Sequence, residues 1–326
     1  MKAILKILGT AICLVLLVIT ALMVLSIAKA KKNARDAMLT EKYYEGFSSP
    51  AALEQKYSQT GGYDVAYAEF PSENRSIQKI RVWYPQEAGP YPMIVVVNAS
   101  NTPASQYEPF FIRLASWGFL VAGNEDPQAG TGETASITLD FILSCDELTG
   151  KIDEGSIGII GYSQGGAGAL CAATNFENSH KYKAIFTGSA AYPLLARNMG
   201  WNYDVGRLSI PYFMVAGTGA SDDSGSDPDS SFGGVAPLSS LVENYGQITA
   251  NVAKVRARAS GAEHGDILAR ADGYMTAWML YHLQGNEEAG TVFFGGHPEL
   301  LHNKNWQDIE IQEMDSLTNL EEPDVP

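Results

Sequence analysis

The chain has 326 residues, of which 45% are hydrophobic and 18% charged, ordinary values for a globular protein with a large buried core. A single α/β unit can reach this length. The 22 basic and 37 acidic side chains give a formal net charge of −15 at pH 7. This charge argues against nucleic acid as a partner, because phosphate binding needs clustered Lys and Arg.

The first 30 residues are interpreted as a membrane anchor. The 22 residues from Ile7 to Ala28 carry no charge and consist mainly of Leu, Ile, Val and Ala. Such a run is long enough to cross the ~30 Å hydrocarbon layer as a transmembrane helix. The alternative is a cleaved signal peptide, whose apolar stretch is usually about 7–15 residues, and Ala28-Lys29-Ala30 resembles a cleavage site. The length favours the anchor, and cleavage would make the protein secreted.

The side of the membrane is a separate question. Two lysines precede the span and four basic residues follow it closely, so the positive-inside count does not favour an outward body. A short N-terminal tail nonetheless commonly stays inside, and we expect the body to be extracytoplasmic. Residues 31–60 are polar and are interpreted as a linker, residues 61–315 as the folded domain, and residues 316–326 as a flexible tail.

From residue 61 onward, short apolar runs alternate with longer segments of helical periodicity. The run Met93 to Val97 is apolar throughout, as in a strand covered on both faces. Strands are predicted over 64–70, 80–84, 93–97, 119–122, 157–160, 183–187, 212–216 and 252–259, and helices over 107–117, 135–148 and 164–173. This alternation predicts an α/β fold with a mostly parallel central sheet and helices on both faces.

Cysteine usage adds little. Cys145 and Cys171 both fall in segments interpreted as helices, and their spacing does not establish a disulfide. No CxxC pair or cluster of His and Cys suggests a structural metal, and we expect no metal ion or cofactor.

The segment Gly161-Tyr162-Ser163-Gln164-Gly165 fits G-x-S-x-G, the nucleophile elbow. An apolar strand precedes it and a helical run follows it, which is the context that the motif requires. A serine on such a tight turn has a strained backbone, and side chains in place of the glycines would clash with neighbouring elements. Ser163 is therefore the candidate nucleophile.

A serine hydroxyl needs a base, and in this fold the order along the chain is Ser, acid, His. His264 follows the last predicted strand, in a loop before a helix, and is the candidate base. The other histidines, His180, His282, His297 and His302, lie too early in the chain or in surface and helical segments.

The acid should follow the strand over 212–216. The loop there contains Asp222, Asp223, Asp227 and Asp229. The first two come soonest after the strand, and we favour Asp222, with Asp223 as the alternative. A calcium loop lacks support, because the EF-hand spacing and its terminal Glu are missing.

Two backbone donors are needed to stabilise the oxyanion of an acyl-transfer intermediate. One is the N–H of Gln164, directly after the nucleophile. The second is expected in the loop after the strand over 93–97, where Ser100 is our choice and Ala99 the alternative.

These pieces carry a family resemblance. In VVVNASNT, RLASWGFLVAG, GYSQGG and GVAP, from about Gly61 to Leu283, the chain resembles the bacterial cutinase and polyester-hydrolase branch of the α/β hydrolases. It is also similar to dienelactone-hydrolase-like proteins. The resemblance implies an α/β-hydrolase fold and a triad of Ser163, His264 and Asp222 or Asp223. It also puts Tyr192 near the aromatic position that lines the acyl cleft.

The chain departs from that branch at two positions. Its polyester-degrading members commonly have an aromatic residue at the place of Ser100 and Met at the place of Gln164. Large aromatic polyesters are therefore in doubt as substrates.

Together these features predict a serine esterase acting on a small-molecule or lipid-like ester and held to the membrane by its N-terminal helix. One alternative is a catalytically silent member of the fold that binds a ligand or a cell-envelope partner. The other is acyl transfer or amide cleavage on the same fold.

Overall fold

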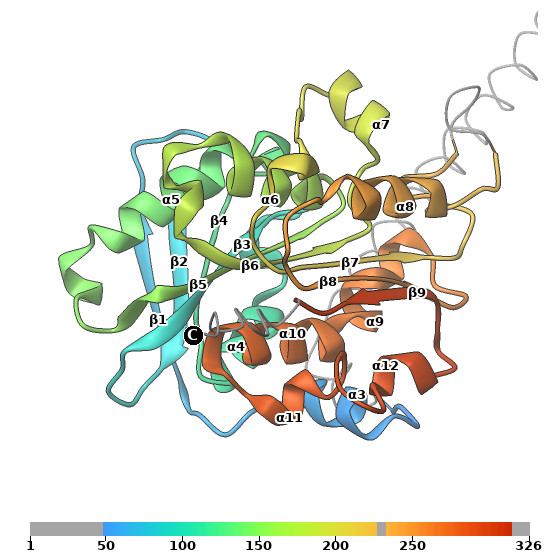
Figure 1. Cartoon of the computed structure of the whole chain (residues 1–326). Helices are drawn as coiled ribbons and strands as arrows, with labels where there is room; N and C mark the ends of the chain where they lie inside the picture. Colours follow the sequence, from blue (N-terminus) through green and yellow to red (C-terminus); the bar gives the residue numbers. More distant parts are fainter. Residues whose placement is uncertain (1–47, 227–232, 315–326) are drawn as a thin grey trace, which may run out of the picture. The chain divides into compact units, whose positions relative to one another are not determined.

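A nine-stranded sheet runs through the described part of the chain, residues 48–226 and 233–314 of the computed structural model (Figure 1). The spatial order is β1-β2-β4-β3-β5-β6-β7-β8-β9. The six strands from β4 to β8 in this order are parallel, whereas β1, β2 and β9 pair antiparallel with their neighbours. The strands are β1 (Val65–Pro71), β2 (Lys79–Pro85), β3 (Tyr91–Val97), β4 (Leu120–Asn124), β5 (Ile152–Tyr162), β6 (Tyr182–Gly188), β7 (Tyr212–Gly217), β8 (Lys254–Ala259) and β9 (Trp306–Gln312).

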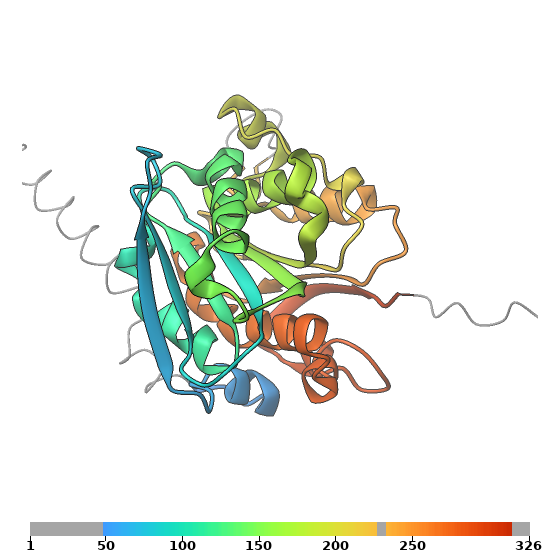
Figure 2. The ribbon, with the colours of Figure 1, turned by 90° about the vertical axis from the view of Figure 1, so that its left-hand side faces the viewer.

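Helices cover both faces of this sheet, as Figures 1 and 2 show. On one face lie α5, α6 and α8, and on the other lie α4 and α10, with α3, α11 and α12 beside them. The helices are α3 (Ala52–Tyr57), α4 (Glu108–Ser116), α5 (Glu133–Leu143), α6 (Gln164–Asn175), α7 (Pro193–Asn198), α8 (Leu238–Gln247), α9 (Ile267–Arg270), α10 (Asp272–Gln284), α11 (Glu287–Gly290) and α12 (Glu299–His302). The mostly parallel sheet and the two helical layers fit the α/β-hydrolase fold. The eight strands predicted from the sequence correspond to β1 to β8.

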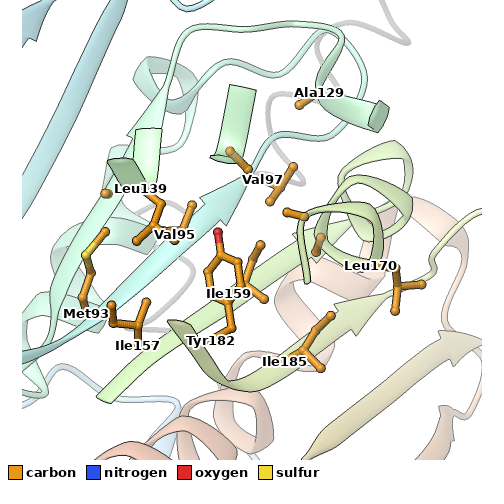
Figure 3. Close-up of a cluster of buried hydrophobic side chains, with 14 of the residues drawn as sticks. Met93, Val95, Val97, Ala129, Leu139, Ile157, Ile159, Leu170, Tyr182 and Ile185 are labelled. Carbon is orange, nitrogen blue, oxygen red and sulfur yellow. The ribbon is translucent and has the colours of Figure 1, made fainter. Parts of the chain in front are cut away.

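Strand β3 shows why the sheet is buried on both faces. Its alternate side chains Met93, Val95 and Val97 pack in one apolar cluster with residues of α5 and α6 (Figure 3). Ile94 and Val96 point to the opposite face and are also buried. Burying each such aliphatic side chain contributes about 1.5–3 kcal/mol, so the continuous apolar run favours a central position.

The opposite face is lined by aromatic rings. Trp278 of α10 packs 5.6 Å from the ring of Phe213 on β7 and 5.0 Å from that of Phe293. Its indole N–H donates to the carbonyl of Ile185 at 3.1 Å. This contact ties α10 to the sheet below the carboxyl ends of the parallel strands.

Helix α3 corrects the predicted linker over 31–60. Tyr57 is fully buried, and its carbonyl accepts a hydrogen bond from Arg113 of α4 at 2.9 Å. The carboxylate of Glu54, 2% exposed, accepts from Trp306 and Asn303, each at 2.8 Å. Residues 52–57 therefore belong to the folded body, because Tyr57 is buried in it and the Glu54 carboxylate has its hydrogen-bond partners there.

Two further expectations need correction. The helix predicted over 135–148 begins at Glu133 and ends at Leu143, so Cys145 lies beyond it, and both Cys145 and Cys171 are free. Strand β9 is an antiparallel edge strand that the sequence analysis did not predict. Its residues are only partly apolar and alternate weakly, which is why the sequence pattern does not reveal it.

The predicted membrane span, the rest of the linker to residue 47 and the tail over 316–326 lie outside the described residues. Within 48–226 and 233–314, none of the helices combines the length and the apolar character needed to cross a bilayer.

Candidate active site

Ser163 stands at the turn from β5 into α6. Its backbone has φ 56° and ψ −123°, a conformation that a non-glycine residue rarely adopts and that costs about 1–3 kcal/mol. Its N–H donates to the carbonyl of Gly188 at the end of β6, at 2.9 Å. The residue is partly exposed.

The two glycines of the motif are required by close approach of the backbone. A Cβ at Gly161 would lie 2.0 Å from the carbonyl oxygen of Gly165. A Cβ at Gly165 would lie 2.2 Å from the carbonyl oxygen of Val97, the last residue of β3. The elbow can therefore lie between β3 and β6 only if both positions lack side chains.

Three predicted residues meet in one hydrogen-bonded chain. His264, the first residue of a short 3-10 turn after β8, brings its Nε2 to 2.9 Å from Oγ of Ser163. Its Nδ1 lies 2.6 Å from Oδ1 of Asp222. With Asp222 ionised, Nδ1–H donates to the carboxylate and Nε2 accepts from the serine, the tautomer that a general base requires.

Asp222 is the innermost of these three hydrogen-bonded residues, and its side chain is fully inaccessible to solvent. Its second oxygen, Oδ2, accepts hydrogen bonds from Oγ of Ser189 at 2.5 Å and from the N–H of Gly217 at 2.7 Å. These donors offset the cost of burying a carboxylate. Nothing in the motif pattern singled out Ser189, which directly follows β6.

The side chain of Asp223 forms an ion pair with Arg258 and does not contact His264. Its Oδ2 lies 2.6 Å from the guanidinium of Arg258, which also pairs with Asp308 of β9 at 2.7 Å. Burial opposes ionisation of Asp223, but N–H groups of Leu238 and Gly225 and the Arg258 charge outweigh it and hold its pKa below the usual range. Of the two candidate acids, only Asp222 contacts His264. The other two candidates in this loop, 227 and 229, lie outside the described residues.

The loop that carries His264 is tied to the acid loop. The N–H of His264 donates to Oγ of Ser221 at 2.8 Å, and that hydroxyl in turn donates to the carboxylate of Glu263. Hydrogen bonds from the Ser221 side chain and backbone hold the pKa of Glu263 below its usual range. Glu263 and Asp266 also form a capping box at the start of the turn. These hydrogen bonds fix the backbone of the loop that carries the imidazole.

The two predicted oxyanion positions lie next to each other. Gln164 is the first residue of the 12-residue helix α6, so its backbone N–H has no acceptor within the helix. Its side-chain oxygen accepts from Oγ of Ser100 at 3.2 Å, and its side-chain amide donates to the carbonyl of Pro127 at 3.2 Å. Among the described residues, the backbone N–H groups of Ala99 and Ser100 have no acceptor. Either N–H is therefore free to donate to a bound group.

Asn98 holds the loop in place. Its buried side-chain amide donates to the carbonyls of Asn124 at 2.7 Å and Asp126 at 2.9 Å, and its oxygen accepts from the hydroxyl of Tyr107 at 2.9 Å. These bonds fix the Asn98 side chain, and its backbone carbonyl lies against the elbow, 2.6 Å from the place of a Cβ on Gly165.

Tyr192 is the N-cap residue that precedes α7, in the segment after β6. Its side chain is 8% exposed, and its N–H donates to the carbonyl of Val235 at 3.0 Å. Two residues earlier, Ala190 packs against the first turn of α6, where a Cβ on Gly166 would lie 2.7 Å from the Ala190 side chain. Tyr192 is thus near the elbow helix, but its hydroxyl bonds none of Ser163, Gln164 and His264.

The other histidines lie apart from this site. His282 of α10 packs 4.1 Å from the ring of Trp278, and burial lowers its pKa to about 3, so it is neutral. His180 and His302 line two separate surface cavities of about 490 and 420 Å³. His297 lies 6.2 Å from His302, ring to ring. Among the described residues, His264 is the histidine that hydrogen-bonds Ser163.

Comparison with known proteins gives one partial match. No protein-family model matches the chain. The chain is 28% identical over 173 residues to the bis(hydroxyethyl) terephthalate hydrolase of Streptomyces coelicolor. The match covers 50% of this chain and 47% of that protein, so the chain spans about half the length of the curated relative it matches. That protein is, by its name, a hydrolase of a terephthalate ester.

Proposed function

We propose that the chain is a serine hydrolase that cleaves carboxylic esters through an acyl-serine intermediate. The observation that carries the proposal is the hydrogen-bonded chain from Ser163 through His264 to the buried carboxylate of Asp222. In sequence, His264 lies 42 residues from Asp222 and 101 residues from Ser163. The order Ser, Asp, His is that of α/β hydrolases. The ester-hydrolysing relative gives independent support.

In the first half of the reaction, Nε2 of His264 removes the proton of Ser163 while Oγ attacks the ester carbonyl. Asp222 stabilises the imidazolium that forms. The backbone N–H of Gln164 and that of Ser100, or of Ala99, donate to the oxyanion, where one such donor is worth about 2.7–4 kcal/mol. The intermediate then collapses, and the imidazolium protonates the departing alcohol.

In the second half, water replaces the alcohol. His264 removes a proton from the water, which attacks the acyl carbon. The intermediate then collapses with cleavage of the Oγ–acyl bond, the imidazolium returns the proton to Oγ of Ser163, and the acid product leaves. The residues supply the base, the nucleophile and the oxyanion donors, so these steps need no metal ion or cofactor.

The proposed substrate is a small-molecule or lipid-like ester, with Tyr192 close to the acyl group. The side chains of Ser100 and Gln164 are polar and hydrogen-bond each other at 3.2 Å. A polar pair offers little stacking area for a large aromatic acyl group, so we favour short or aliphatic acyl chains.

We further propose that residues 1–30 hold the enzyme at a membrane, with an extracytoplasmic body. The uncharged run from Ile7 to Ala28 carries this proposal.

Labelling with a fluorophosphonate probe, together with turnover of short p-nitrophenyl esters, tests the reaction. We expect both, with the probe on the Ser163 peptide by mass spectrometry. Ser163→Ala should lose both, whereas Ser240→Ala, at a buried serine whose hydroxyl bonds the carbonyl of Pro237, should keep them. A wild-type chain that is neither labelled nor active would rule out the proposal.

A further inference from the structure

Ser189 combines deep burial with an unusual backbone. It directly follows β6, is 1% exposed and has φ 45°. Positive φ in a non-glycine residue costs about 1 kcal/mol or more and persists where surrounding contacts require it. Glycine would adopt this conformation freely, but it would bring no side chain.

The contacts of Ser189 join the two ends of the proposed triad. Its Oγ donates to Oδ2 of Asp222 at 2.5 Å, and its N–H donates to the carbonyl of Val215 on β7 at 2.8 Å. The preceding carbonyl, that of Gly188, accepts the N–H of Ser163 at 2.9 Å. A single dipeptide therefore contacts the backbone of the nucleophile and the side chain of the acid.

We propose that Ser189 is a positioning residue for the hydrolysis, whose hydroxyl orients the Asp222 carboxylate toward His264. This inference rests on the proposed function. A carboxylate can rotate about its Cβ–Cγ bond, and the N–H of Gly217 alone would hold Oδ2 from one direction. The Ser189 hydroxyl adds a second direction, and Oδ1 is then left facing Nδ1 of His264.

The same hydroxyl moderates the charge that His264 experiences. Within residues 48–226 and 233–314, Asp222 accepts from three donors, the ring of His264, the hydroxyl of Ser189 and the N–H of Gly217. Hydrogen bonds to a buried carboxylate delocalise and stabilise its negative charge. Without the Ser189 hydroxyl, the Asp222 carboxylate attracts the protonated His264 ring more strongly, which favours the imidazolium over the neutral imidazole.

Ser189→Ala tests the role. We expect kcat to fall about 10- to 100-fold, the range for losing one hydrogen bond to a charged group, with KM nearly unchanged. The acidic limb of the kcat/KM profile should move to higher pH, because the imidazole keeps its proton more strongly and the base form appears later. A role limited to folding would leave the pH profile in place.

Ser189→Gly separates the hydroxyl from the strained backbone. Glycine relieves the strain at φ 45° but, like alanine, removes the hydroxyl. We expect both variants to share the kinetic defect and the pH shift, with the glycine variant melting at least as high as the alanine variant. Ser240→Ala removes a buried hydroxyl that contacts no triad residue and should change neither kcat nor the profile.

If the wild-type chain hydrolyses esters and reacts with the fluorophosphonate probe, two results would overturn the role of Ser189 and leave the proposed function intact. One is an unchanged kcat and pH profile in Ser189→Ala. The other is wild-type kinetics in Ser189→Gly, which would assign the effect to the backbone. A wild-type chain without turnover or labelling would instead remove the proposed function, and the inference with it.

Discussion

At the scale of single residues, two adjacent aspartates have different environments. Asp222 is fully buried against His264, Ser189 and Gly217, whereas Asp223 pairs with Arg258 at the edge of the sheet. Neighbouring loop residues project in different directions, so only one of them reaches the imidazole. The difference can be tested with two equivalent substitutions.

Asp222→Asn should lower kcat by about 10⁴, the scale reported for neutralising the acid of a serine-protease triad. An amide cannot stabilise the imidazolium and can donate to Nδ1, which favours the wrong tautomer. Asp223→Asn, the matched control, should change kcat little and mainly weaken the pair with Arg258. Kinetics on a short p-nitrophenyl ester distinguish the two, and equal losses would contradict the assignment of the acid.

At the scale of elements, helices α4 and α10 are joined by a buried ion pair between Arg113 and Asp272. Both side chains are at most 1% exposed. Arg113 also donates to the hydroxyl of Thr276 at 2.7 Å and to the carbonyl of Tyr57 in α3. One guanidinium thus links three helices, and removing it would leave a buried carboxylate without its partner.

Arg113→Met should therefore destabilise the fold by about 3–5 kcal/mol at neutral pH. Burial raises the pKa of Asp272, opposed by Arg113, so the folded carboxyl keeps its proton to higher pH than the unfolded one. Its contribution to stability is complete below about pH 4 and declines as pH rises. Without the arginine the pKa of Asp272 should rise further, so the decline should continue to higher pH than in wild type, and the stability gap to wild type should widen from pH 5 to pH 8.

Denaturant unfolding at both pH values measures that gap. Asp272→Asn in both the wild-type and the Arg113→Met backgrounds removes the titrating group, and the stability gap between these two variants should then not depend on pH. A gap that is the same at pH 5 and pH 8 in Arg113→Met would contradict the role given to Asp272.

Helix α3 offers a second test at this scale. A chain beginning at residue 48 should fold, whereas one beginning at residue 61 should lose much of its stability. Tyr57→Ala isolates one contact and should cost about 3–5 kcal/mol, as for other large buried aromatics. Tyr63, 43% exposed, is the control, and Tyr63→Ala should cost much less. Similar losses in both variants, measured by denaturant unfolding, would contradict the docking of α3.

At the scale of the whole molecule, the sheet brings the proposed machinery to one edge. Parallel strands end at the same side, so the loops after β3, β5, β6, β7 and β8 deliver the oxyanion loop, Ser163, Ser189, Asp222 and His264 to a common site. None of these residues lies in the first 30, so activity should not need the proposed anchor.

The full chain should therefore partition into membranes and need detergent for release, while a chain beginning at residue 48 should stay in solution and retain esterase activity. Fractionation followed by probe labelling measures both. Mass spectrometry of the native N-terminus distinguishes the signal peptide, because a mature protein starting at Lys31 would show cleavage after Ala30. Protease accessibility in intact cells then reports the side on which the body lies.

The sequence by itself determined the features that depend on neighbouring residues. A tight turn between a strand and a helix needs glycine at two fixed positions, so Ser163 could be found from its motif. Apolar runs bounded by turn residues located eight strands. His264 followed from the order of residues in the fold and from the small number of histidines.

The tertiary structure alone decided the features that depend on contacts between distant segments. Asp222 and Asp223 have the same chemistry and nearly the same place in the chain, and only the folded loop directs one to His264. Ser189 lies 33 residues from Asp222, and Glu54 of α3 lies 252 residues from Trp306 of β9. A local pattern cannot report such pairs, because the partner that stabilises each side chain is supplied by another part of the chain.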